Sequence, residues 1–134
     1  MTQDALKRRY AGSQTFLQEA CLFLSLSSIA EQVADTTIDI LGTLAHCKRQ
    51  GYINENNEMT VDGQCKYLRD LTGKNWRREV MTELPDEIPD EMYTVEKWKT
   101  DKYTHFKRRF MDTLENSQTV KNGKLVEYYC YIHD

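Results

Sequence analysis

The sequence predicts an α+β fold in which helices come first and an antiparallel sheet follows. Between residues 17 and 73, apolar side chains recur at helical spacing, and glycines stand where helices would stop. Beyond residue 75, short runs rich in aromatic and β-branched residues are separated by turn-forming residues. Helices and strands that are segregated along the chain are typical of the α+β class.

Length and composition indicate one ordinary globular domain that covers residues 1–134. Hydrophobic residues make up 40% of the chain and charged residues 29%, and there are only two prolines and six glycines. This composition differs from that of disordered or fibrous proteins. A single hydrophobic core is therefore expected.

Three helices are predicted in the first half. The first, over residues 17–34, has a wide apolar face and is expected to be the central, largely buried helix. Thr36 or Thr37 can cap the second, which runs to the stop signal Gly51. Asp62 is predicted to cap a short third helix that ends at Gly73; its inward residues would be Cys65, Leu68 and Leu71.

The second half is predicted to form strands and turns. WRREVM and MYTVEKW are separated by an acidic loop, TELPDEIPDE, which two prolines hold open. YTHFKRRFM comes next, and QTVKNGKLVEYYCYI follows. Asn122-Gly123 lies inside that last stretch and predicts a hairpin, because both positions of the tight turn need positive φ.

Hydropathy and net charge indicate which kinds of partner are not expected. The apolar run Ala20–Leu26 is far shorter than the roughly 20 residues of a membrane span, so no membrane partner and a cytoplasmic location are expected. The net charge of −3 and pI of about 5.6 make nucleic acid an unlikely partner. The alternative is a phosphate-binding stripe from three basic clusters, which are Lys7-Arg8-Arg9, Arg77-Arg78 and Lys107-Arg108-Arg109.

The four cysteines favour free thiols over a metal site. Cys21, Cys47, Cys65 and Cys130 are widely spaced and form no CxxC. Cys130 and His133 make a single C-x-x-H pair, whereas structural zinc needs four ligands. No metal and no cofactor are therefore expected.

Cys21 is the candidate nucleophile, since the first turn of a helix stabilises a thiolate. His105, in a probable strand, is the candidate base, and Asp112 or Asn116 could orient its imidazole. Gln18 or Gln14 could donate to an oxyanion. In the competing interpretation, Cys21 is a buried core residue and His105 is structural.

The order of these motifs resembles a known family. Gln18 and Cys21 open LFLSLSSIAE, and TVDGQCKYLRDLTGK, THF and NSQTVKNGKL follow. This succession resembles the papain-like cysteine peptidases of the bacteriocin-processing type, and more closely a group of small phage- and prophage-associated proteins of that fold. The resemblance implies Cys21 as nucleophile, His105 as base, Gln18 as oxyanion donor and Asp112 as orienting acid. Ala20 and Thr113 stand where the family often has Gly and Pro.

We therefore expect a protein of papain-like fold that hydrolyses an amide bond through a thioester intermediate. A peptide or protein would be its substrate or partner. The alternative is the same fold without catalysis, used as a binding module in a phage or host-interaction role. The acidic loop at 82–91, if it overhangs the cleft, predicts selection of basic substrates.

Overall fold

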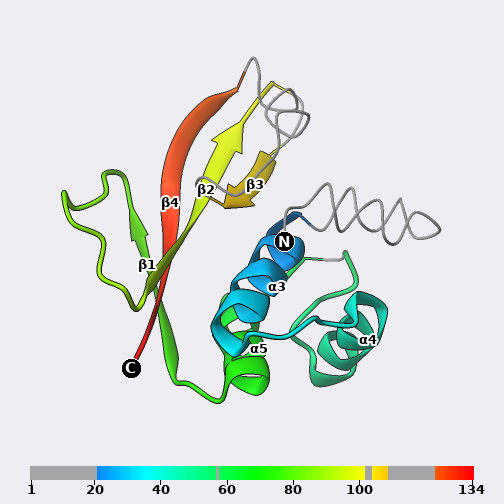
Figure 1. Ribbon diagram of the computed structural model, residues 1–134. Helices are drawn as coiled ribbons and strands as arrows, with labels where there is room; N and C mark the ends of the chain where they lie inside the picture. Colours follow the sequence, from blue (N-terminus) through cyan, green and yellow to red (C-terminus); the bar gives the residue numbers. More distant parts are fainter. Residues whose placement is uncertain (1–20, 57, 102–103, 109–122) are drawn as a thin grey trace.

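The computed structural model describes residues 21–56, 58–101, 104–108 and 123–134. These residues form three helices followed by a four-stranded antiparallel sheet (Figure 1). The predicted α+β class is confirmed. Among the described helices, none combines the length and the hydropathy that a membrane span requires.

The central helix is α3, Cys21–Ala34, and its N-terminal two thirds are buried. Its serines are buried without losing hydrogen bonds, because Ser25 Oγ donates to Cys21 O at 2.9 Å and Ser27 Oγ to Phe23 O at 2.8 Å. Such bonds to the preceding turn let a hydroxyl enter an apolar core at modest cost. The predicted residues 17–20 of this helix lie outside the described residues.

The second helix is α4, Ile40–Gln50, and its N-cap differs from the prediction. Asp39, in an extended conformation, precedes the helix, so neither Thr36 nor Thr37 caps it. Thr36 instead donates its backbone N–H to Glu31 O at the end of α3. The predicted stop is confirmed: Gly51 has a φ of 76°, which glycine adopts without a Cβ clash.

The third helix is α5, Val61–Thr72, and Thr60 rather than Asp62 is its N-cap. Thr60 Oγ1 accepts the Gly63 N–H at 2.9 Å, while Asp62 lies within the first turn and pairs with Lys66. The predicted end at Gly73 is confirmed.

The inward face of α5 also differs in part from the prediction. Leu68 is buried as expected, but Cys65 and Leu71 are only partly buried. Gln64 and Tyr67 are the larger residues that fill this face.

The sheet has the order β1-β4-β2-β3. Its strands are β1 (Trp76–Met81), β2 (Met92–Lys99), β3 (Thr104–Arg108) and β4 (Lys124–His133). The long strand β4 pairs antiparallel with both β1 and β2, so the last strand lies inside the sheet. The run before the predicted Asn-Gly turn lies outside the described residues, and Gly123 directly precedes β4.

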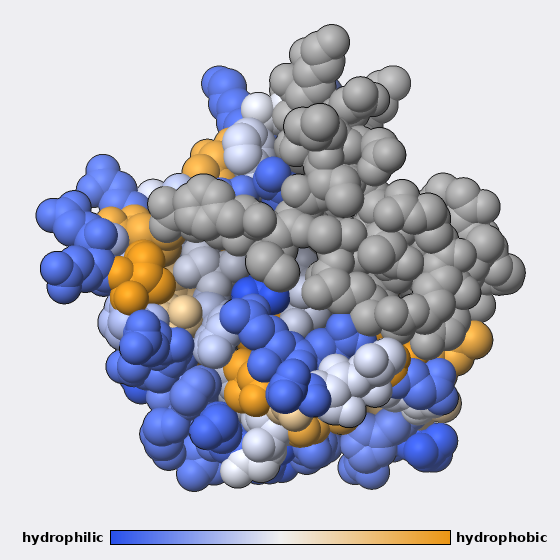
Figure 2. Space-filling view, viewed as in Figure 1, coloured by the Kyte–Doolittle hydropathy of each residue, from blue (hydrophilic) through white to orange (hydrophobic). Residues whose placement is uncertain are grey.

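The two faces of the sheet bury different cores. Helices α3 and α5 pack on one face, where Tyr93, Val95, Tyr129 and Tyr131 join the main hydrophobic cluster. A small second cluster, Met92, Cys130 and Ile132, occupies the opposite face. Among the described residues visible in Figure 2, hydrophilic side chains predominate and hydrophobic ones form small separate groups.

Candidate functional site

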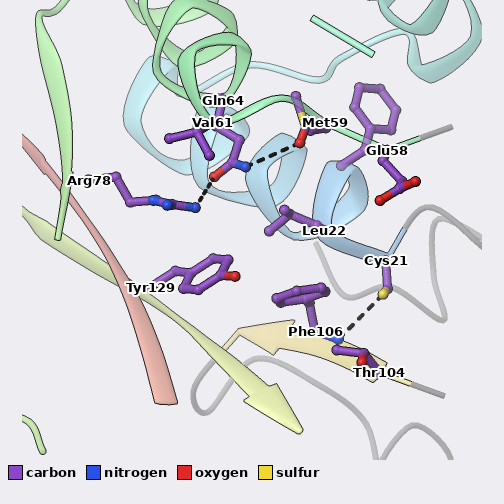
Figure 3. A pocket seen from close by; sticks show the side chains of 11 residues that line it. Cys21, Leu22, Glu58, Met59, Val61, Gln64, Arg78, Thr104, Phe106 and Tyr129 are labelled. Atoms are coloured by element: carbon purple, nitrogen blue, oxygen red, sulfur yellow. Dashed lines mark hydrogen bonds between the residues drawn. The ribbon is translucent and has the colours of Figure 1, made fainter. Parts of the chain in front are cut away.

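Cys21 lies at the beginning of the described part of α3 and touches the sheet. Cys21 is 7% exposed, and its Sγ accepts the backbone N–H of Phe106 at 3.3 Å (Figure 3). A strand's N–H groups lie in the plane of the sheet, and β3 is the last strand of the described sheet. The thiol therefore lies beside the outer edge of β3.

His105 precedes Phe106 on β3, so the structure brings Cys21 to the strand that carries the predicted base. Side chains alternate between the two faces of a strand, and Arg108 identifies the face of β3 that packs against α3. Its guanidinium donates to Ser28 Oγ at 3.1 Å and to Gln32 Oε1 at 2.8 Å, both on α3. Phe106 shares that face, whereas His105, 5% exposed, alternates to the other one. A Cys21–His105 pair would therefore have to form around the edge of the strand.

Four further residues were predicted for the site. Gln14, Gln18, Asp112 and Asn116 all lie outside the described residues.

A pocket of about 300 Å³ opens beside Cys21. Its walls come from α3, α5, the segment before α5 and the strands β1, β3 and β4. The lining residues are Cys21, Leu22, Phe23, Glu58, Met59, Val61, Gln64, Arg78, Thr104, Phe106 and Tyr129. Figure 3 shows Cys21 and Arg78 at opposite ends of it. The lining contains no residue of the acidic 82–91 loop, so the described pocket offers no support for selection of basic substrates by that loop.

Arg78 is held in place by a chain of hydrogen bonds. Its Nη1 donates to Gln64 Oε1 at 3.2 Å, and the same oxygen accepts the buried Tyr131 hydroxyl at 2.7 Å. Gln64 is 2% exposed, and its Nε2 donates to Met59 O at 3.4 Å. The guanidinium also lies 4.5 Å from the centre of the Tyr129 ring.

Burial raises the pKa of three of the four thiols, which disfavours their nucleophilic thiolate form. Burial, reinforced by the Asp70 charge, raises the pKa of the Cys47 thiol to about 12. Burial also raises the pKa values of Cys65 and Cys130. No disulfide joins any of the four. A thiol probe therefore meets little competition from these three residues.

The other two histidines, His46 and His133, interact with neighbouring side chains of the fold. His46 Nε2 lies 3.1 Å from Asp70 Oδ2, which also accepts the Tyr52 hydroxyl at 2.8 Å. His133 packs against Trp76 and Tyr93. Among the residues whose positions are described, no three His, Cys, Asp or Glu side chains are grouped to hold a metal ion.

Arg78 lines the pocket but was predicted only as half of a basic pair and not as a site residue. The alternation of WRREVM was the available signal, because adjacent strand residues point to opposite faces. Arg77 indeed lies on the other face, where its Nε is 3.3 Å from Glu79 Oε1. No family model, curated protein or solved structure matches this chain.

Proposed function

We propose that this protein is a cysteine peptidase or amidase of papain-like type, with Cys21 as nucleophile and His105 as general base and then acid. The observation that supports the proposal is the Phe106 N–H donated to Cys21 Sγ, one residue from His105 and at the end of a pocket. A thiolate accepts such a bond more strongly than a thiol does, so the bond favours the nucleophilic form.

The proposed reaction is acyl transfer from an amide. The Cys21 thiolate attacks the amide carbonyl carbon, and His105 gives a proton to the departing amine, which leaves a thioester. Water, deprotonated by His105, then hydrolyses the thioester and releases the acid. In this proposal Gln18 donates to the oxyanion and Asp112 orients the imidazole, in keeping with the papain-like resemblance.

The decisive experiment is the pH dependence of Cys21 alkylation by iodoacetamide, followed by mass spectrometry of the native protein. We expect an apparent thiol pKa well below the ordinary value of about 8.5. Replacing the base by His105→Ala should raise that pKa, whereas the surface variant His46→Ala should leave it unchanged. Cys47, Cys65 and Cys130 serve as internal slow references. An ordinary or raised pKa of Cys21, indifferent to His105, would reject the catalytic pair.

The second candidate is the same domain without catalysis, acting as a binding module. Two observations favour it: the thiol is nearly buried, and strand alternation directs His105 to the face opposite Phe106. It predicts slow, uniform alkylation of all four cysteines together with ligand binding in the pocket. A nucleic-acid-binding stripe receives no support, because Arg77 and Arg78 lie on opposite faces of β1.

A further inference from the structure

The pocket holds a positive charge that the peptidase proposal leaves unused. Arg78 lies at the end of the pocket farther from Cys21 (Figure 3). Within the described ranges, no Asp or Glu oxygen lies within ion-pair distance of its guanidinium. The neighbouring cation differs in this respect, since Lys97 Nζ lies 3.2 Å from Glu127 Oε1.

The surroundings of Arg78 preorganise it for an anion. Gln64 holds one terminal nitrogen and is itself fixed by Tyr131 and Met59, while Tyr129 lies alongside the guanidinium. An arginine fixed in this way loses little side-chain entropy when it binds a partner. Its other N–H groups remain able to donate to a carboxylate, which matches the planar guanidinium with two parallel hydrogen bonds.

The rest of the lining fits a short peptide segment. Leu22, Met59, Val61 and Phe106 supply apolar surface between the two ends of the pocket. The volume of about 300 Å³ lies at the lower limit of small-ligand sites, which span about 300–1,000 Å³. Glu58 also lines the pocket, but it lies on the Cys21 side in Figure 3 and makes no ion pair with Arg78. Glu58 therefore does not neutralise Arg78, and the Arg78 end of the pocket keeps its positive charge.

We propose that Arg78 is a carboxylate-binding residue and that the ligands of this pocket are peptides with a carboxylate at the end remote from Cys21. The carboxylate is either the free C-terminus of the peptide or an Asp or Glu side chain, because both present the same two oxygens. The role of these peptides as substrates rests on the proposed peptidase function. The binding site itself does not.

Binding is tested first, without turnover, in full-length protein carrying Cys21→Ala. The probes are two matched pairs of peptides: N-acetyl-Ala-Ala as free acid and as amide, and N-acetyl-Ala-Glu-amide with N-acetyl-Ala-Gln-amide. Affinities are measured by titration followed by two-dimensional NMR. We expect the acid of at least one pair to bind about tenfold or more tightly than its neutral partner. The pair that shows the preference identifies the source of the carboxylate.

Arg78→Gln should remove this preference, and the neighbour Arg77→Gln should retain it, since Arg77 is on the other face. Glu58→Gln should leave the preference intact or increase it. Arg78→Lys keeps the charge without the planar fork and should retain only part of the preference, which guards against a folding defect in Arg78→Gln. Equal binding of acid and neutral peptides, or a preference that survives Arg78→Gln in folded protein, overturns the proposal.

The two proposals can fail separately. Carboxylate binding through Arg78 together with an unreactive Cys21 would keep the site and reject the peptidase. A reactive, His105-dependent Cys21 with no carboxylate preference would keep the peptidase and reject the site.

Discussion

At the scale of single residues, this protein places hydroxyl groups inside its core and pairs them. Tyr67 is fully buried on α5, and its hydroxyl lies 2.6 Å from Ser27 Oγ on α3. Burial raises the pKa of this phenol well above its ordinary value, so it stays neutral. The bond links two helices through a water-excluded region, where an unpaired hydroxyl is costly.

Tyr67→Phe should lower the free energy of unfolding by about 1–2 kcal/mol, because it removes that bond and leaves Ser27 with one buried partner fewer. Urea denaturation measures the change. Tyr128→Phe, at a partly exposed position on β4, is the control and should be near neutral. An equal loss in both variants would mean that the Ser27 contact contributes nothing specific.

The lowered pKa of the Asp70 carboxyl predicts that the stability of the protein depends on pH. Partial burial alone would raise the pKa of this carboxyl, but hydrogen bonds from His46 and Tyr52 and the charge of Arg69 outweigh that effect and lower it. A lowered pKa in the folded state gives stability that is present above the ordinary value of about 3.9 and lost as pH falls through the folded pKa.

Asp70→Asn should therefore cost stability near neutral pH and flatten the loss of stability on acidification. Urea unfolding at a series of pH values between about 6 and 3 measures this slope. Asp62→Asn, at a side chain 78% exposed, is the matched control and should change the slope little. An unaltered slope in Asp70→Asn would show that its pKa is the same in the folded and unfolded states.

At the scale of elements, helix α5 packs closely against the Tyr52 backbone because residue 63 is a glycine and has no Cβ. A Cβ on Gly63 would lie 2.6 Å from Tyr52 Cα and 2.8 Å from Tyr52 O, both backbone atoms that cannot move aside. Gly42 in α4 offers the contrast, because a Cβ there would meet only the side chain of Asp39.

Gly63→Ala should destabilise the protein by about 1–3 kcal/mol despite the better helix propensity of alanine. Gly42→Ala should be near neutral or stabilising, since Asp39 can rotate away and alanine is favoured in helices by about 1 kcal/mol. Thermal unfolding followed by circular dichroism compares the two. A stabilising Gly63→Ala would mean that α5 is not packed against Tyr52 in solution.

At the scale of the whole molecule, Arg108 joins the sheet edge to the central helix. It is 7% exposed, and its guanidinium donates to Ser28 and Gln32 across the interface between β3 and α3. This interface also contains the Cys21–Phe106 contact, so the geometry of the candidate site depends on how β3 is held.

Arg108→Leu should loosen β3 from α3 and speed hydrogen exchange of the amides in 104–108 more than in β4. Exchange of the Phe106 amide is the specific readout, since it donates to Cys21. Lys107→Gln, on the other face near Glu96 and Trp98, should not produce this local effect. Uniformly faster exchange in both variants would indicate general destabilisation instead.

Much of the secondary structure could be predicted because its signals are local. Gly51 and Gly73 end helices where predicted, and WRREVM forms β1 with the predicted bounds. The predicted N-caps were wrong because several residues of capping type stand near each helix start. Thr60 accepts the Gly63 N–H, whereas Asp39 takes the N-cap position of α4 in an extended conformation without a side-chain hydrogen bond.

The sequence by itself determined the α+β class, the order of helices and strands and the candidates Cys21 and His105. Periodicity and turn chemistry act over a few residues and can be read along the chain. Only the tertiary structure decided that β4 lies between β1 and β2, that Cys21 meets the Phe106 amide, and which of the two neighbours Arg77 and Arg78 faces the pocket. These features depend on which distant segments bury one another's apolar faces, and local patterns carry no information about that choice.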